Sequence, residues 1–379
     1  MKAKTIKGYS PDEIKSALQQ SLAAGYKPTL AIVFLSVKQD RDAVCSILDQ
    51  EGISIFGATT SGEFISSEIS EGGIVIMLLD MNPAFFKILF FETFDSSAHE
   101  ISKQVGIEGM KFFSNAAFII ASGWLHTDGE QVVKGIEEGA GREVTIFGGM
   151  AGDDLSLREP LVFTYGKHSK TGLIAILIDE DKIDIKGIAT CGWRPIGTTK
   201  TVTHSSGNIV YTIDDKPALD LVIKYLGLNI DADSNTEVIT NIGAYYPLQL
   251  ERENAAAVMR TAMLGNKDDR SVICAGNIPQ GSKVRFSLPP DFDVIDTVIR
   301  ECTDLKNESP QEADAVIMFS CISRYLSFGV MTGEEIDRVE KVWNAPLIGF
   351  FSYGEYGKSR NGKHEFYNNT CCVVVLKEK

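Results

Sequence analysis

The amino-acid sequence predicts an α/β protein in which repeated strand-helix-strand-turn-strand units form mixed β-sheets covered by helices, arranged in two domains. Short apolar runs rich in β-branched residues, which are typical of buried strands, alternate with stretches whose apolar residues recur at helical spacing. This order of elements occurs three times along the chain, which indicates an internal repeat. In each copy, a turn of small residues with a carboxylate follows the second strand.

The first helix and the first buried strand are well marked. In "SPDEIKSALQQSLAAGY", Ser10 is the expected N-cap, Pro11 suits the first helical position and Glu13 completes a capping box. The apolar face of this helix indicates that it packs against the rest of the protein. "TLAIVFLSV" at 29–37 has the pattern of a buried strand, and the helix "RDAVCSILDQEG" and the strand "ISIFGATT" follow it.

The three copies are compared most easily through their opening strands, helices and turns. The opening strands are expected at 29–37, 116–122 and 315–321, with helices at 130–141 and 332–343 in the second and third copies. The turns line up as Gly57-x-x-x-Ser61-Gly62-Glu63, Gly148-x-x-Ala151-Gly152-Asp153 and Gly349-x-x-x-Tyr353-Gly354-Glu355. One such turn arises easily by chance, whereas three in the same context indicate a common structure.

Between the second and third copies, the sequence changes character. Segment 192–227 is expected to form strands and then a helix that ends near Gly227, and later segments favour strands with a hairpin around Pro279-Gln280-Gly281. We place a domain boundary near residue 220, inside this region. The predicted organisation is a helical extension at 1–27, an N-terminal domain at 28–220 and a C-terminal domain at 221–379.

Composition and charge exclude several classes of function. The 37 Lys and Arg residues against 51 Asp and Glu residues leave a net charge of −14, which disfavours binding to nucleic acids or anionic membranes. The longest strongly apolar run, at 73–81, is far too short to span a bilayer. The N-terminus lacks the apolar stretch of a secretory signal, and the seven cysteines include no C-x-x-C pair. These features predict a cytoplasmic protein with reduced thiols.

The three turns are the first candidates for a ligand site. In open α/β sheets, ligands bind at the carboxyl ends of strands, where these turns are expected to lie. Glycine lets the backbone approach a ligand closely, and hydroxyl and carboxylate side chains bind polar groups such as an ammonium. The residues concerned are Thr59, Thr60, Ser61, Gly62, Glu63, Gly149, Asp153, Tyr353 and Glu355. The structural alternative is that glycine permits a tight turn and the carboxylate caps a neighbouring amide.

Further candidates follow the third opening strand and precede the last one. Arg324, expected on a loop after the strand that ends at Ser320, either binds a ligand carboxylate bidentately or forms a surface ion pair. In "YNNT", Asn368 and Thr370 occupy alternate positions, so they would share one face of a strand and offer an amide and a hydroxyl to a ligand. The alternative for this segment is a turn that enters the last strand.

The segment "SGWLHTDGE" places Trp124, His126 and Asp128 after the second opening strand, where Asp128 is expected to cap the next helix. No two histidines have metal-ligand spacing, and no phosphate-binding loop or calcium loop is complete. We therefore expect no metal ion and no cofactor.

Four motifs in one order carry a family resemblance: "IFGATTSGEF", "IFGGMAGDD", "FSCISRYLSFG" and "IGFFSYGEYG…FYNNT". They resemble the signatures of the FIST domain, a sensory module with an N-terminal and a C-terminal part. The resemblance covers most of the chain and identifies segments 28–220 and 221–379 as the two FIST-like parts. It departs from the family at Tyr367, where other members tend to have a histidine before the asparagine.

The resemblance implies a non-enzymatic sensor in intracellular signal transduction that binds an amino acid or a similar small molecule. Such a sensor acts alone or through a separate signalling protein. In this interpretation, Arg324 binds the carboxylate of the ligand, and Glu63 or Glu355 binds its amine. Two alternatives stay open: an amide or ester hydrolase with Ser61 or Cys321 as nucleophile, and a scaffold that binds only proteins. No histidine is adjacent in sequence to Cys321 to act as its base.

Overall fold

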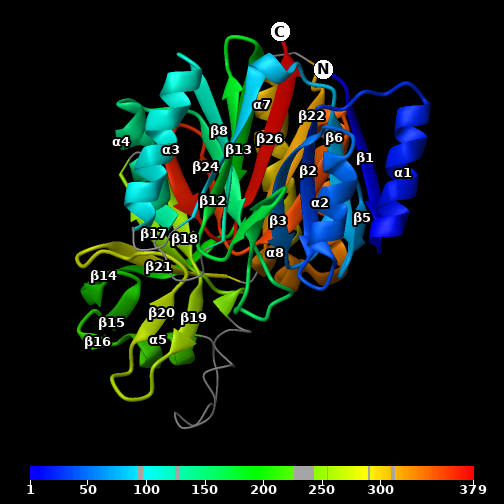
Figure 1. Ribbon diagram of the computed structural model, residues 1–379. Helices are drawn as coiled ribbons and strands as arrows, with labels where there is room; N and C mark the ends of the chain where they lie inside the picture. The colour runs from blue at the N-terminus through cyan, green and yellow to red at the C-terminus, as the bar shows by residue number, and fades with distance from the viewer. Residues whose placement is uncertain (93–96, 124–128, 226–242, 254, 289–290, 309–311) are drawn as a thin grey trace.

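Figure 1 shows a computed structural model of the chain, which describes residues 1–92, 97–123, 129–225, 243–253, 255–288, 291–308 and 312–379. Within these residues, the strands form three six-stranded sheets and one eight-stranded sheet. The eight-stranded sheet lies below the other three in the view of Figure 1. The predicted α/β class with mixed sheets is confirmed.

The first six-stranded sheet has the order β1-β6-β2-β3-β10-β11. The elements of the first unit are β1 (Ala3–Gly8), α1 (Pro11–Ala23), β2 (Leu30–Ser36), α2 (Arg41–Asp49), β3 (Ser54–Thr60), β4 (Glu63–Ile65), β5 (Glu68–Ser70) and β6 (Ile74–Leu79). Strands β2 and β3 are parallel, and β6 returns antiparallel to β2. The segment 1–27 contains the expected helix, but this helix follows β1, a strand of the sheet that was not predicted.

The second and third units repeat this order of elements, and the third adds the helix α8 before α9. The second comprises β7 (Phe86–Phe91), α3 (Ala98–Phe112), β8 (Ala116–Ser122), α4 (Gly129–Ala140), β9 (Ile146–Met150), β10 (Val162–Thr164), β11 (Lys167–Ser169) and β12 (Leu173–Asp179). The third comprises β13 (Ile183–Thr190), α7 (Phe292–Glu308), β22 (Ala315–Cys321), α8 (Ile322–Phe328), α9 (Thr332–Trp343), β23 (Leu347–Ser352), β24 (Glu355–Lys358), β25 (His364–Tyr367) and β26 (Cys371–Glu378). Two 3₁₀ turns, η1 (Pro83–Phe85) and η2 (Gly329–Met331), complete the described part of these units.

A hairpin from a neighbouring unit completes each six-stranded sheet. The β4–β5 hairpin of the first unit pairs with β23 of the third unit. The β10–β11 hairpin of the second unit pairs with β3 of the first, and the β24–β25 hairpin of the third pairs with β9 of the second. This exchange draws the turn that precedes each hairpin toward the neighbouring unit.

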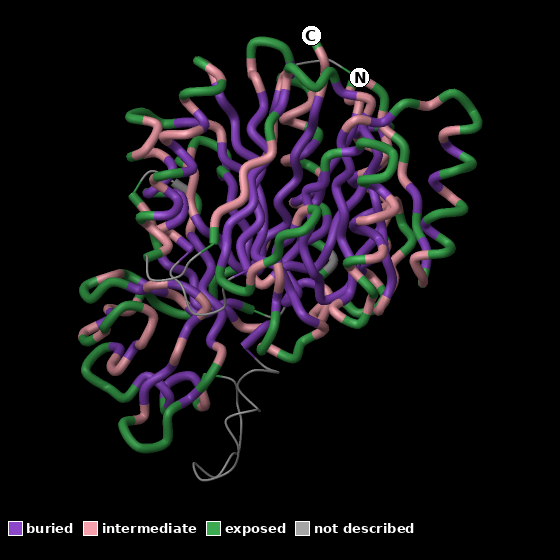
Figure 2. The backbone as a smooth tube through the Cα atoms, viewed as in Figure 1, coloured by how far each residue is buried: buried purple, intermediate pink, exposed green. Residues whose placement is uncertain are grey.

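The strands are continuously apolar because both faces of each sheet are covered. On one face of β2, Ile32 and Phe34 join a core shared by all three sheets. On the other face, Val33 packs with residues of α1 and α2. The other two sheets have their own helix-covered clusters, under α3 and α4 and under α7 and α9. Figure 2 shows the buried trace concentrated in these strands.

The eight-stranded sheet, which we call the inserted sheet, lies between β13 and α7 in the sequence. Its elements are β14 (Pro195–Ser206), β15 (Ile209–Ile213), β16 (Lys216–Pro217), α5 (Ala218–Tyr225), β17 (Leu248–Arg252), β18 (Ala255–Arg260), β19 (Ala262–Gly265), β20 (Val272–Cys274) and β21 (Lys283–Ser287). It has a separate hydrophobic core, which includes Val202, Val222 and Val284. The third unit therefore begins before this sheet, at β13, and resumes after it.

Candidate functional site

The three carboxylate-bearing turns lie side by side, although they are far apart in the sequence. Backbone hydrogen bonds join each pair of neighbouring turns: from Gly152 N–H to the Thr59 carbonyl, from Met150 N–H to the Gly354 carbonyl and from Phe351 N–H to the Gly62 carbonyl, each 2.8 Å long. Gly152 is required for this approach, because a Cβ atom there would lie 2.5 Å from the hydroxyl of Ser61. The exchange of hairpins thus builds a closed ring of turns.

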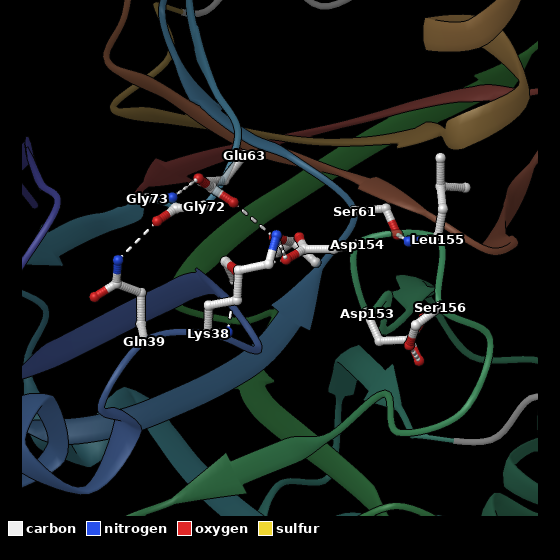
Figure 3. Close-up of polar contacts among 12 residues, drawn as sticks. Lys38, Gln39, Ser61, Glu63, Gly72, Gly73, Asp153, Asp154, Leu155 and Ser156 are labelled. Atoms are coloured by element: carbon white, nitrogen blue, oxygen red, sulfur yellow. Dashed lines mark hydrogen bonds and ion pairs between the residues drawn. The ribbon is translucent and has the colours of Figure 1, made fainter.

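Glu63, in the first turn, is fully buried and uses its carboxylate within the turn. It accepts hydrogen bonds from the Thr60 hydroxyl at 2.7 Å, the Ser70 hydroxyl at 2.9 Å and the Gly73 N–H at 2.6 Å. Burial raises the pKa of Glu63, although these hydrogen bonds oppose the shift. Figure 3 shows Glu63 against the Gly72–Gly73 backbone, with Lys38 reaching toward Asp154.

Asp153, in the second turn, organises the loop that follows it (Figure 3). Its carboxylate accepts hydrogen bonds from the Ser156 hydroxyl, from the Tyr353 hydroxyl and from the N–H groups of Leu157, Arg158 and Glu159. Burial opposes ionisation, but these donors outweigh it and lower the pKa of Asp153. The carboxylate compensates for the left-handed backbone of the loop, in which the φ of Leu157 is 54°.

Glu355, in the third turn, is fully buried beside Cys321. Burial raises the pKa of Glu355 to about 8, although the Ser352 hydroxyl at 2.6 Å and the Thr370 N–H at 3.3 Å donate to its carboxylate. Burial and the charge of Glu355 also raise the pKa of the Cys321 thiol to about 12. A nucleophilic cysteine requires the opposite environment, one that stabilises a thiolate.

Arg324 lies on α8 rather than on the expected loop, and its donors are used inside the protein. It forms a fully buried, two-pronged ion pair with Glu335 and donates to the carbonyls of Cys191 at 2.7 Å and Asn369 at 3.0 Å. Its guanidinium also lies 5.2 Å from the ring centre of Trp193. These contacts favour a structural role for Arg324 over the predicted binding of a ligand carboxylate.

In "YNNT", Tyr367 is the last residue of β25, and residues 368–370 form the turn into β26. The segment therefore follows the alternative expected from the sequence, a turn that enters the last strand, and Asn368 and Thr370 do not share a strand face. Asn369 has a left-handed φ of 55° and joins the turn to the segments beside the inserted sheet. It donates to the Ala244 carbonyl at 2.8 Å and accepts from the Thr261 hydroxyl at 2.6 Å. Asn368 is also buried, but within the described residues neither its amide nitrogen nor its amide oxygen has a hydrogen-bond partner.

The replacement Asn368→Leu is expected to leave the free energy of unfolding unchanged or to raise it by about 1 kcal/mol, because it removes buried polar atoms that are unpaired. Chemical denaturation measures this value. The control Asn369→Leu removes two formed hydrogen bonds and is expected to lower the value by about 2 kcal/mol or more. Equal losses in both variants would contradict the interpretation of Asn368 as an unsatisfied group.

A cavity of about 240 Å³, which we call the junction cavity, lies between the inserted sheet and the third unit. Its lining includes Gln249 and Met259 of the inserted sheet, Trp193, Glu301 of α7, Arg360, Tyr367 and Thr370. Of the residues predicted from the sequence, Thr370 alone is in the lining of this cavity. Tyr367 stood out in the sequence only as a family departure, and the other lining residues come from segments that showed no motif.

The remaining predicted residues support the ring of turns. Thr59 donates to the Gly152 carbonyl at 2.7 Å, and Gly149 pairs with Glu355 in the β9–β24 ladder. Ser61 accepts a long hydrogen bond, 3.4 Å, from the N–H of Leu155. Trp124, His126 and Asp128 lie outside the described residues.

The junction cavity, of about 240 Å³ between two packed parts of an α/β scaffold, is the candidate ligand site. The FIST N domain model matches residues 29–216 and the FIST C domain model matches residues 218–358, so the chain belongs to the FIST family. FIST domains are generally sensory, signal-transduction domains. The chain is also 23% identical over 392 aligned residues to "Uncharacterized protein MJ1623" of Methanocaldococcus jannaschii, covering 92% of this chain and 73% of that protein. No helix in the described part of the chain is long and apolar enough to cross a membrane.

Proposed function

We propose that this FIST protein is a cytoplasmic sensor that binds a small polar ligand, an amino acid or a similar metabolite, in the junction cavity without catalysis. The observation that carries this proposal is the composition of the cavity wall. Gln249 and Met259 belong to the inserted sheet, whereas Thr370 and Glu301 belong to the third unit. A ligand in this cavity contacts both parts of the molecule at once.

The lining has the chemistry that an amino acid requires. Arg360 and Glu301 supply opposite charges, 4.0 Å apart, for the carboxylate and the ammonium of a zwitterion. Trp193 and Tyr367 supply aromatic surface for an apolar side chain. Arg360 is ion-paired with Asp304 and Glu308, but these side chains are exposed, and such pairs contribute only about 0–1 kcal/mol. Its guanidinium can therefore exchange a protein partner for a ligand.

This site differs from the one expected in the turns because the turn carboxylates already have partners. Glu63 and Asp153 each accept at least three hydrogen bonds from their own surroundings. We propose that the ring of turns instead keeps the lining of the junction cavity rigid. Thr370 belongs to that lining, and its N–H donates a hydrogen bond to Glu355 of the third turn. Ligand binding then changes the equilibrium position of the inserted sheet, which a separate signalling protein recognises.

A calorimetric and thermal-shift survey of the standard amino acids tests the ligand class. At least one compound is expected to bind and to raise the melting temperature, because a ligand that binds only the folded state stabilises it. The variant Ala257→Phe fills the junction cavity, which Ala257 lines, and is expected to weaken that binding by about tenfold or more. Ala275→Phe adds the same ring to another half-buried alanine of the inserted region, outside the cavity lining, and serves as the control.

Two results would count against the proposal in different ways. If no compound in the survey stabilises the protein, the sensor function loses its support. If a compound binds Ala257→Phe as tightly as it binds the unmodified protein, the ligand lies elsewhere than in the junction cavity.

A further inference from the structure

A larger cavity, of about 490 Å³, lies beside the junction cavity, and we call it the hairpin cavity. Its walls come from the edge strand β13, from α7, from β9 and from the loop of the β24–β25 hairpin. The residues that bear on its chemistry are Lys186, Glu301, Glu308, Lys358, Arg360 and His364. Neither the turns nor the family motifs identified this region.

The hairpin cavity has in its lining a cation that is unpaired among the described residues, although the net charge of the protein is −14 and Lys186 is ion-paired with Asp184 at 2.7 Å. Three cationic side chains line it, against two carboxylates. Arg360 is ion-paired with Asp304 and Glu308, whereas Lys358 has no ion pair within the described part of the chain. An exposed lysine without a partner keeps its full charge for an incoming anion.

His364 supplies a hydrogen-bond acceptor to the same lining. Its Nδ1 lies 2.7 Å from the Ile146 carbonyl oxygen, and because that oxygen can only accept, Nδ1 carries the hydrogen. Nε2 then holds the lone pair of the neutral ring. Burial lowers the pKa of His364 to about 4, so the ring is neutral near pH 7. The edge-to-face contact with Phe147, with ring centres 5.3 Å apart, fixes the orientation of the imidazole.

We propose that the hairpin cavity is a second binding site, for a small anion whose carboxylate or phosphate pairs with Lys358 and Arg360 and whose hydroxyl hydrogen is accepted by Nε2 of His364. Hydroxycarboxylates and monohydrogen phosphate groups combine these two features. Arg360 and Glu301 line both cavities, whereas Lys186, Lys358 and His364 line the hairpin cavity and not the junction cavity, so the response to Lys358→Gln distinguishes the two sites.

Isothermal titration of the full chain with L-malate and, separately, with inorganic phosphate tests this proposal. Binding of one probe with a Kd of about 1 mM or tighter is expected, and the probe that binds identifies the carboxylate or the phosphate as the recognised group. Lys358→Gln is expected to weaken binding about tenfold through loss of a charge-assisted contact. The control is Lys363→Gln, which removes the same charge five residues along the chain from a side chain that is 80% exposed and outside the lining.

Nuclear magnetic resonance of the imidazole of His364 in the unmodified protein gives a second measurement that needs no variant. The Nε2 resonance is expected to shift with the same affinity as the calorimetric signal. Absence of binding by both probes would overturn the proposal, as would an equal loss of affinity in Lys358→Gln and Lys363→Gln. Anion binding by Ala257→Phe that matches the unmodified protein supports a separate site. Failure of amino acid binding alone would affect only the junction cavity.

Discussion

Replacing Glu335 with alanine is expected to lower the free energy of unfolding by about 3–5 kcal/mol, the largest effect of any single substitution considered for this protein. The side chains of Arg324 and Glu335 are both fully buried, so the variant leaves the guanidinium charge without its counter-charge. Two carbonyl acceptors and two aromatic rings remain around Arg324, but none of them neutralises the charge. Equilibrium unfolding in urea measures the difference.

Two further variants separate the charge effect from a general effect on α9. Glu334→Ala removes the preceding carboxylate, which is half exposed and 3.6 Å from Arg338, and is expected to change stability by less than about 1 kcal/mol. The double variant Arg324→Met with Glu335→Leu removes both charges and is expected to recover most of the lost stability. A loss in Glu335→Ala no larger than that in Glu334→Ala would show that the buried pair is not required.

The contribution of Glu355 to the free energy of unfolding is expected to fall as the pH rises from about 4.5 to 8. Burial raises the pKa of Glu355 from 4.5 to about 8, so in this range the folded state retains a proton that the unfolded state has released. The stabilising contribution is fully present below the unfolded pKa and is lost as the pH rises through the folded pKa, by at most about 1.4 kcal/mol per pH unit. Urea denaturation across this range, in one buffer series, measures the slope.

The comparison with Glu355→Gln isolates this contribution, because glutamine has the same shape and does not titrate. His364 acts in the opposite direction between about pH 4 and 6.5, since burial lowers its pKa, and both proteins share that effect. The unmodified protein is therefore expected to lose stability relative to Glu355→Gln as the pH rises toward 8. A constant difference between the two proteins would show that Glu355 titrates near its ordinary pKa.

Most individual helices and strands could be predicted from the sequence, because the residues that define each of them lie close together in the chain. The helix predicted at 332–343 is α9, and the strands predicted at 116–122 and 315–321 are β8 and β22. Capping residues, helical spacing and buried β-branched runs all act within a few residues of the chain. The hairpins β4–β5, β10–β11 and β24–β25 were missed, because strands of three or four residues leave little periodicity.

The candidate site could be predicted only in part from the sequence, because its geometry depends on contacts between segments that are far apart in the chain. The sequence by itself determined the class of fold, the carboxylate in each turn and the family motifs. The tertiary structure alone decided that each hairpin joins a neighbouring unit and that Arg324 pairs with Glu335. Only the tertiary structure shows that Gln249 and Thr370, which are far apart in the sequence, both line the junction cavity. A charged side chain has the same sequence signature whether it meets a ligand or another residue, and burial with its partners makes the distinction.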